Sequence, residues 1–443
     1  MQKPDKLRVA YIAAGAAGMI CGSCLRDNAL VGALQKLGCD AVLIPTYTPL
    51  RLDEEDVSLN QVFFGGINVF LQQKSALFRL IPRFLDRALD HPALLKKVAA
   101  GSIPTEARLL GDLALSMLRG TDGYQAKEVE RLVDFLESGV RPHLVNLTNI
   151  LIAGVVPALK SRLGVPVVAT LQGDDAFLDQ LEEPYREKVL DKIRETVPLI
   201  DGFIVFSRTY GEEMSRMLHI PQGRMFRVPL GLNIEGFPAT AGRSGTIGGV
   251  KRIGYLARVC PAKGFDVLVE SFIHLKSGEG MESVELHAAG WLGESHRPFF
   301  EQQVDRIREA RLERSFQYHG VLNRGQKLKF LRSLDVFSVP AQSMEAKGLY
   351  ILEALASGVP VVEPNHGPFP ELLKRTGGGV LVTPGDREEL AAVLAGLLGN
   401  PQRRGSLAEE GHSRVHASLT AAHMAERTLK VYRRVLKHRS RGC

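Results

Sequence analysis

The chain has 443 residues, of which 45% are hydrophobic and 24% are charged, a composition typical of globular proteins and not of disordered or fibrous ones. This length is too great for one hydrophobic core and predicts two domains. No run of 18 apolar residues occurs, so we expect no membrane-spanning helix. The first apolar run is too short for a signal peptide, and we therefore expect a cytoplasmic protein.

The net charge of +7 is concentrated in two stretches. Residues 74–97 carry six Lys/Arg and two Asp, and residues 428–443 carry six Lys/Arg and no acid. Residues 74–97 are also amphipathic, which predicts either a helical lid or a surface that meets a lipid-linked acceptor or the inner face of a membrane. No aromatic-basic platform or zinc motif accompanies these stretches, so we expect no nucleic-acid partner.

Five cysteines in a chain of this length do not indicate a disulfide framework. Cys21 and Cys24 form a CGSC motif where a helix is expected to begin, a position that stabilises a thiolate. A redox or zinc site would need a second CxxC or a histidine cluster, and the sequence has neither nearby. We therefore expect no metal and no other cofactor.

The first half of the chain alternates between strands and helices. Residues 8–14 predict a buried strand, followed by a glycine-rich turn and a helix over about 25–37, an order typical of nucleotide-binding α/β domains. The turn lacks the GxGxxG spacing, so it is a weak signal alone. A strand at 41–44 precedes a long insertion, about 48–124. The elements expected after it are strands at 143–147, 165–171, 202–206 and 226–229, and helices at 125–138, 151–163, 185–196 and 208–218.

Polar residues directly follow the strand expected at 165–171. Gln172, Asp174 and Asp175 lie where ligands bind in parallel sheets, at the carboxyl ends of the strands. Capping of the next helix by one of the aspartates is the alternative interpretation.

A stretch rich in Gly, Ser, Thr and Ala, residues 238–251, predicts an interdomain linker. A second α/β series follows, in which Arg258 and Lys263 flank a strand-to-helix turn and form a candidate diphosphate site. The expected strands are 252–257, 283–289, 315–319, 335–339, 359–362 and 379–382; the helices are 263–276, 296–311, 325–333, 349–357, 368–375, 386–398 and a final stretch at about 401–438.

Residues 345–363 place Glu345 before a glycine turn and Glu353 inside the helix that follows. The start of such a helix favours an anion. If both glutamates were helical they would lie about 12 Å apart, too far for the carboxyl pair of a glycosidase. Two separate roles on one bound molecule are the stronger hypothesis, and two solvated glutamates are the alternative.

These motifs resemble the donor-binding domain of retaining GT-B glycosyltransferases of glycosyltransferase family 4. Glu345 and Glu353 match the Glu-x7-Glu motif of that family, and residues 254–272 resemble its Arg…Lys diphosphate motif. Residues 228–237 and 369–373 are also similar, so the resemblance covers nearly all of residues 200–400. It implies two Rossmann-like domains facing across a cleft, with the C-terminal helix crossing back to the N-terminal domain. The expected domains are 1–240, 250–420 and a C-terminal helix with its tail, 421–443.

The resemblance also implies residue roles. Arg258, Lys263 and the backbone N–H groups of Gly348 and Leu349 would hold the diphosphate, and Glu345 would contact the sugar. The other donor contacts implied are Glu353 at the ribose, the backbone of Val321 and Leu322 at the base, and Gly22 and Ser23 where the family has a glycine pair. Gln172 replaces a histidine of many relatives and, with Asp174, would lie on the acceptor side.

The expected function is transfer of a hexose-type sugar, with retention, from a nucleotide-diphosphate sugar to a hydroxyl acceptor. Lipid, growing polysaccharide and small metabolite remain open as acceptors. A nucleotide-sugar epimerase of related fold is one alternative. A nucleotide-sugar-binding relative without transferase activity is another, because Gln172 and Lys347 depart from the family pattern.

Overall fold

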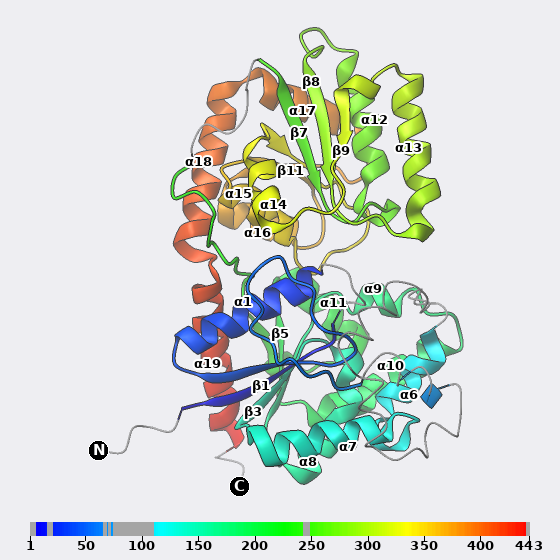
Figure 1. Ribbon diagram of the computed structural model, residues 1–443, viewed down its shortest axis with the longest axis vertical. Helices are drawn as coiled ribbons and strands as arrows, with labels where there is room; N and C mark the ends of the chain where they lie inside the picture. The colour runs from blue at the N-terminus through cyan, green and yellow to red at the C-terminus, as the bar shows by residue number, and fades with distance from the viewer. Residues whose placement is uncertain are drawn as a thin grey trace. The chain divides into compact units, whose positions relative to one another are not determined.

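The computed structural model describes residues 6–15, 21–64, 69, 72–73, 110–241 and 249–439. The chain forms two compact units, each with one parallel sheet (Figure 1). The N-terminal unit is Met1–Pro229 with Ala421–Cys443, and the C-terminal unit is Leu230–Thr420. The predicted basic segment 74–97 lies outside the described residues. None of the helices in the described ranges is both long and apolar enough to cross a bilayer.

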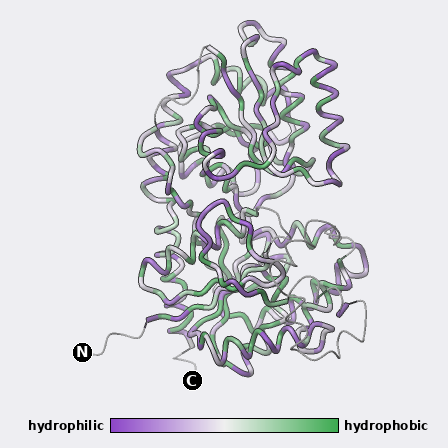
Figure 2. The backbone as a smooth tube through the Cα atoms, in the orientation of Figure 1, coloured by the Kyte–Doolittle hydropathy of each residue, from purple (hydrophilic) through white to green (hydrophobic). Residues whose placement is uncertain are grey.

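The sheet of the N-terminal unit has six parallel strands in the order β2-β1-β3-β4-β5-β6. Short apolar runs rich in Val, Ile and Leu form its central strands, which are buried on both faces as parallel strands usually are (Figure 2). The strands are β1 (Arg8–Ala13), β2 (Asp40–Pro45), β3 (Leu144–Leu147), β4 (Val167–Thr170), β5 (Gly202–Val205) and β6 (Met225–Arg227).

Helices cover both faces of this sheet (Figure 1). The first helix begins at Gly22, three residues before the predicted start, with Cys21 as its N-cap. The helices are α1 (Gly22–Lys36), α6 (Gly111–Leu118), α7 (Ala126–Phe135), α8 (Val156–Arg162), α9 (Asp175–Leu178), α10 (Tyr185–Thr196), α11 (Arg208–Leu218) and α19 (Ala421–Arg439).

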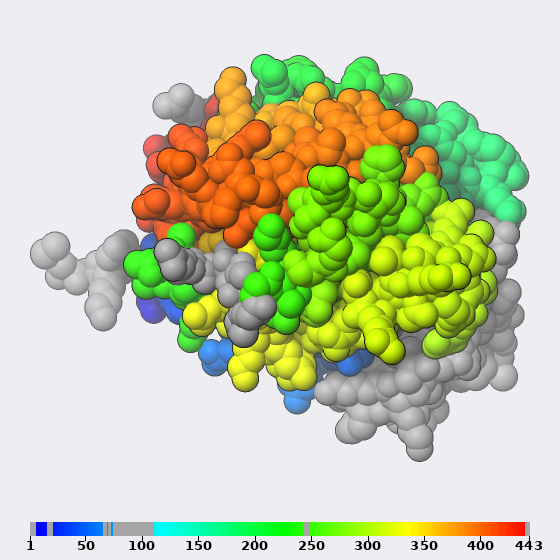
Figure 3. Space-filling view, turned by 90° about the horizontal axis from the view of Figure 1, so that it is seen from above, coloured from blue at the N-terminus to red at the C-terminus, as the bar shows by residue number. Residues whose placement is uncertain are grey.

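The C-terminal unit repeats the plan, with strand order β12-β11-β10-β7-β8-β9. In Figure 3 the orange surface of α17 and α18 lies beside the yellow-green surface of α12 and α13. The strands are β7 (Lys251–Leu256), β8 (Val284–Ala289), β9 (Phe316–Tyr318), β10 (Val336–Phe337), β11 (Val361–Pro364) and β12 (Gly379–Val382). The helices are α12 (Phe265–Lys276), α13 (Arg297–Glu309), α14 (Arg324–Arg332), α15 (Leu349–Ala356), α16 (Phe369–Thr376), α17 (Arg387–Gly399) and α18 (Pro401–Ser418). Two doubly wound sheets confirm the predicted fold class.

The helical stretch expected at 401–438 is two helices, because the chain is held in an extended turn between α18 and α19. Leu419 accepts a hydrogen bond from Leu232 N–H at 2.8 Å, and Thr420 forms a β-bridge with Leu232. Beyond this break α19 belongs to the N-terminal unit and packs on α1. Its Tyr432 hydroxyl donates to Asn146 Oδ1 at 3.0 Å, which confirms the expected return of the last helix.

Candidate functional site

An ion pair joins two loops at the carboxyl side of the C-terminal sheet. Lys263 Nζ contacts Glu345 Oε1, with the two side chains 17% and 12% exposed. Lys263 ends a short 3-10 turn and does not begin α12 as predicted, because Gly264 intervenes with φ of 65°. A Cβ on Gly264 would lie 1.8 Å from Pro340 O, so only glycine allows this close approach. The turn therefore fixes where Lys263 meets Glu345.

Arg258 follows β7 on the same side of the sheet and is exposed. Its backbone carbonyl accepts a hydrogen bond from the buried Tyr255 hydroxyl at 2.7 Å. The strand thus anchors the main chain at Arg258 while its guanidinium reaches solvent, where it is free to meet an anion.

The loop after β10 carries Glu345, and Gly348 with φ of 80° begins α15. Glu345 is therefore not helical, so the separation of about 12 Å that assumed one continuous helix does not apply. Gly348 and Leu349 are buried, and the first N–H groups of the helix have no acceptor within the helix itself. Those groups, and Lys263 from the turn after β7, are two sources of positive potential beside Glu345.

Glu353 is buried in α15 and pairs with Lys327 of α14. The distance from Lys327 Nζ to Glu353 Oε1 is 2.6 Å, and the two side chains are 8% and 9% exposed. A capping box between Asn323 and Gln326 fixes the start of α14 and so the position of Lys327. Glu353 is therefore not a solvated glutamate. No sequence pattern pointed to Lys327, because a lysine within a helix is usually exposed.

A second carboxyl and a phenol lie buried beside the Lys263–Glu345 pair. Glu363 of β11 is fully buried; among the described residues its carboxyl accepts one long hydrogen bond, 3.3 Å from Val339 N–H to Oε1, and its Oε2 has no hydrogen-bond partner. Burial raises the pKa of Glu363 well above its usual range, and the nearby Glu345 charge adds to the rise. Burial, with the Glu345 charge, also raises the pKa of Tyr350. The raised pKa favours the protonated form of Glu363, a residue that the sequence pattern did not single out because it lies within a strand.

Val321 and Leu322 form the loop between β9 and α14, and Val321 is 45% exposed. His319, just before them, has its Nε2 2.9 Å from His287 Nδ1. Burial, with His287 nearby, lowers the pKa of His319. This loop therefore combines the exposed apolar side chain of Val321 with the imidazole of His319, a surface compatible with a flat aromatic ring.

In the N-terminal unit, Gly22 and Ser23 are the first residues of α1 and are half-buried. Gln172, after β4, is buried, and its amide donates to Thr148 O at 2.8 Å and to Asp27 Oδ2 at 3.2 Å. Asp174 accepts from the N–H groups of Ile150 and Gln172, at 2.8 and 2.9 Å. Both predicted acceptor-side residues thus tie loops together at the ends of β3 and β4. Asp174 is the N-cap residue of α9, but its side chain forms no capping hydrogen bond there, so the alternative interpretation does not hold for Asp174.

A buried charged network underlies this region and was missed from the sequence. Arg26 Nη1 donates to Tyr11 Oη at 2.6 Å and to Asp27 Oδ1 at 2.9 Å, and its guanidinium lies 5.0 Å from the Phe206 ring centre. Asp27 also accepts from Tyr11 and from the Thr148 hydroxyl. Burial lowers the pKa of Arg26, but the Tyr11 and Asp27 interactions outweigh it and raise that pKa overall. The network locks the first turns of α1 to the ends of β1, β3 and β4.

No three His, Cys, Asp or Glu side chains in the described ranges are grouped so as to hold a metal ion. The two clusters that do form differ in kind. In the C-terminal unit, half-exposed cations lie next to carboxylates and a helix start, an arrangement that can bind a diphosphate and hydroxyl groups. In the N-terminal unit, the polar groups mainly bind one another.

Residues 238–414 match the family model described as glycosyl transferases group 1. Among curated proteins, D-inositol 3-phosphate glycosyltransferase of Xylanimonas cellulosilytica is 28% identical over 48% of this chain and 52% of its own length. Glycogen synthase of Mycobacterium tuberculosis is 24% identical over 66% of this chain and 69% of its own. The chain thus spans from about half to two thirds of these relatives.

Two solved structures share the fold over nearly the whole chain. Sucrose-phosphate synthase from Thermosynechococcus elongatus has a TM-score of 0.70 at 17% identity, covering 97% of this chain and 100% of its own. Anabaena HepE in complex with UDP has a TM-score of 0.66 at 14% identity, covering 96% and 99%. At these identities the likeness shows the fold alone.

Proposed function

We propose that this chain, whose residues 238–414 match the glycosyl transferases group 1 family model, transfers a sugar from a nucleotide-diphosphate sugar to a hydroxyl acceptor with retention. The observation that carries the proposal is the Lys263–Glu345 pair beside the start of α15. Names and titles of similar proteins support it: Anabaena HepE was solved with UDP-glucose, and several curated relatives are named mannosyltransferases.

The diphosphate would be held by Arg258, Lys263 and the first N–H groups of α15. Negative charge grows on the leaving diphosphate as the bond to the sugar breaks, and fixed positive groups stabilise that charge. A diphosphate would compete with Glu345 for Lys263, because it offers a larger negative charge. We propose that donor binding draws Lys263 toward the phosphates and leaves Glu345 to accept hydrogen bonds from sugar hydroxyls. These cations cover the diphosphate, so the proposal includes no metal.

The nucleoside would lie along α14 and α15. Glu353, oriented by Lys327, would accept hydrogen bonds from the ribose hydroxyls. The backbone of Val321 and Leu322 would meet the base, and the half-buried His319 lies at the same loop. In this scheme the acceptor hydroxyl attacks on the face that the diphosphate leaves, and no separate general base is assigned. The membrane contact predicted from residues 74–97 stays a prediction.

A donor screen tests the proposal. The full chain is incubated with a panel of nucleotide sugars, with and without a lipid extract, and release of nucleoside diphosphate is measured. We expect acceptor-dependent release, reduced at least about 100-fold by Glu345→Gln and by Arg258→Gln, since each removes a group that acts on the transition state. Glu388→Gln, an exposed glutamate of α17, is the matched control and should release at the wild-type rate.

Other outcomes of the same screen contradict the proposal. Conversion of the donor sugar without an acceptor indicates an epimerase, and binding of a nucleotide sugar without any release indicates a protein that has lost catalysis. Near-normal release by Glu345→Gln would exclude the assigned site.

A further inference from the structure

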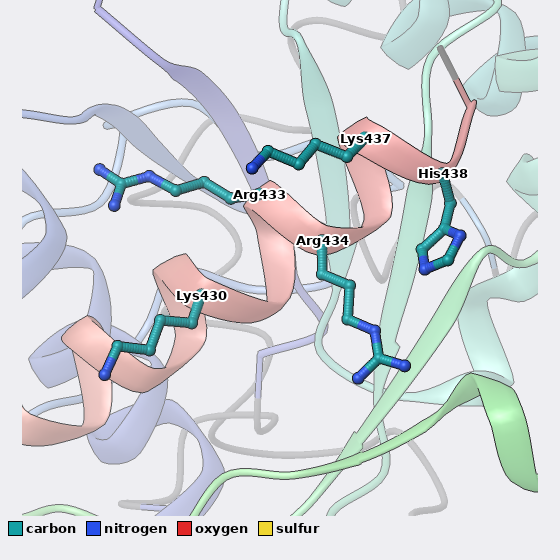
Figure 4. A pocket seen from close by; sticks show the side chains of 5 residues that line it. All are labelled: Lys430, Arg433, Arg434, Lys437 and His438. Carbon is teal, nitrogen blue, oxygen red and sulfur yellow. The ribbon is translucent and has the colours of Figure 1, made fainter. Parts of the chain in front are cut away.

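The exposed side of α19 is a basic surface that the proposed transfer reaction does not use. Its lining side chains, shown in Figure 4, are Lys430, Arg433, Arg434, Lys437 and His438. We propose that this basic face docks the protein on an anionic phospholipid surface. The proposal stands apart from the donor site, because none of these residues belongs to the C-terminal unit.

The spacing of the basic residues places them along one side of the helix. Positions 430, 433, 434, 437 and 438 follow helical periodicity and extend over about 12 Å. The other side is buried in the core: Val431, Tyr432 and Val435 are 8%, 0% and 4% exposed. The helix is therefore amphipathic, with its apolar side already covered by its own unit and its basic side left for another partner.

Three basic side chains of this face, Lys430, Arg433 and Arg434, are exposed. Among the residues that the structure describes, no carboxylate forms an ion pair with Lys430, Arg433 or Arg434. By contrast Arg162 of α8 is surrounded by three acids, Glu130, Asp134 and Glu137. Sequence positions 428–443 hold six Lys/Arg and no acid, so the field of this face is strong and of one sign.

The arrangement of the side chains suits a surface of many anions. Figure 4 shows Arg433 and Lys437 extending to one side of the helix while Arg434 and His438 extend to the other. Their charged ends spread apart and do not converge on one point, so they match phosphates distributed over a membrane better than one phosphate group. The nearby ring of Phe226 is covered by Arg434 at 5.2 Å, which leaves it unavailable for stacking on a nucleic-acid base.

The test is flotation of the full chain with lipid vesicles at low salt. We expect binding to phosphatidylcholine vesicles that contain phosphatidylglycerol, none to pure phosphatidylcholine, and release by added salt. The double variant Lys430→Gln/Arg433→Gln should lower the partition coefficient roughly thirty-fold, from the loss of two cations near the surface. Lys329→Gln/Arg332→Gln on α14 removes the same residue types at the same spacing from another exposed helix and should partition like the wild type.

Three results would overturn the proposal. The wild-type protein could fail to float with anionic vesicles, or the α19 variant could bind them as well as the wild type does. The α14 control could also lose as much vesicle binding as the α19 variant. Tighter binding to a short RNA than to vesicles would assign the face to nucleic acid instead. Nucleoside diphosphate release by the α19 variant on a water-soluble acceptor should be unchanged, which separates docking from the donor site.

Discussion

In both sheets of this protein, polar residues lie at the carboxyl ends of the strands. The two sets of residues differ in their accessibility to solvent and in their partners. In the C-terminal unit Lys263 and Glu345 pair with each other and are partly accessible, and Arg258 is exposed. In the N-terminal unit Asp27 and Gln172 are buried and hydrogen-bonded to the protein itself. A charged residue at a strand end thus indicates a ligand site only where its side chain is accessible to solvent.

The largest expected effect is on stability, in the N-terminal unit. Asp27→Ala removes the carboxylate that neutralises the buried Arg26 and accepts from Tyr11. Breaking a buried ion pair by deleting one partner costs about 3–5 kcal/mol, so we expect the free energy of unfolding to fall by that amount. Chemical denaturation followed by circular dichroism measures it. Asp40→Ala, an exposed aspartate at the start of β2, should lie within about 0.5 kcal/mol of the wild type. If the Asp27→Ala protein is as stable as the wild type, the buried network does not stabilise the N-terminal unit, and the proposed difference between the two units is wrong.

The next effect is on turnover, in the C-terminal unit. Lys263→Gln removes a cation from the proposed diphosphate site, and release of nucleoside diphosphate should fall about 100- to 1000-fold, a loss of roughly 3 kcal/mol of transition-state stabilisation. The melting temperature should change little, because the ion pair is partly exposed. A variant that unfolds but keeps its turnover per folded molecule would show that Lys263 is structural, like Asp27.

The smallest effect is a pH dependence that belongs to Glu363. The pKa of Glu363 is raised in the folded protein, so the native state binds this proton more tightly than the unfolded state does. The stabilisation from this group is therefore complete below the ordinary glutamate pKa and is lost as the pH rises through the raised pKa. Glu363→Gln cannot ionise, so it should gain stability relative to the wild type as pH rises. We expect the difference in unfolding free energy to grow by at least about 1 kcal/mol between about pH 5 and pH 8. A difference that is constant with pH would mean that Glu363 is ionised in the native state.

Local sequence predicted most of the fold and the charged residues of the candidate donor site. Apolar runs and glycine turns fix strands and helix starts within a few residues, and Arg258, Lys263, Glu345 and Glu353 lie in short segments with recognisable spacing. The match of residues 238–414 to the family follows from the same segments. Their assigned roles stay proposals, to be tested by the variants above.

What the sequence could not predict depends on long-range burial. Arg26, Lys327 and Glu363 are polar residues in apolar surroundings that only the folded chain creates, so no periodicity marks them. The partners lie far apart in sequence: Glu353 is 26 residues from Lys327, and Gln172 is 145 residues from Asp27. The break between α18 and α19 also depends on a distant segment, the strand-like pairing at Leu232.

That break has a consequence for how the protein is made. The C-terminal unit is a continuous stretch, Leu230–Thr420, but the N-terminal unit needs α19, which is synthesised only after the whole C-terminal unit. At roughly 5–20 residues per second, the nascent N-terminal sheet waits on the order of ten seconds or more for the helix whose Met424 and Tyr432 complete its core. During synthesis the C-terminal unit can therefore finish folding before the N-terminal unit, whose core is complete only once α19 has been made.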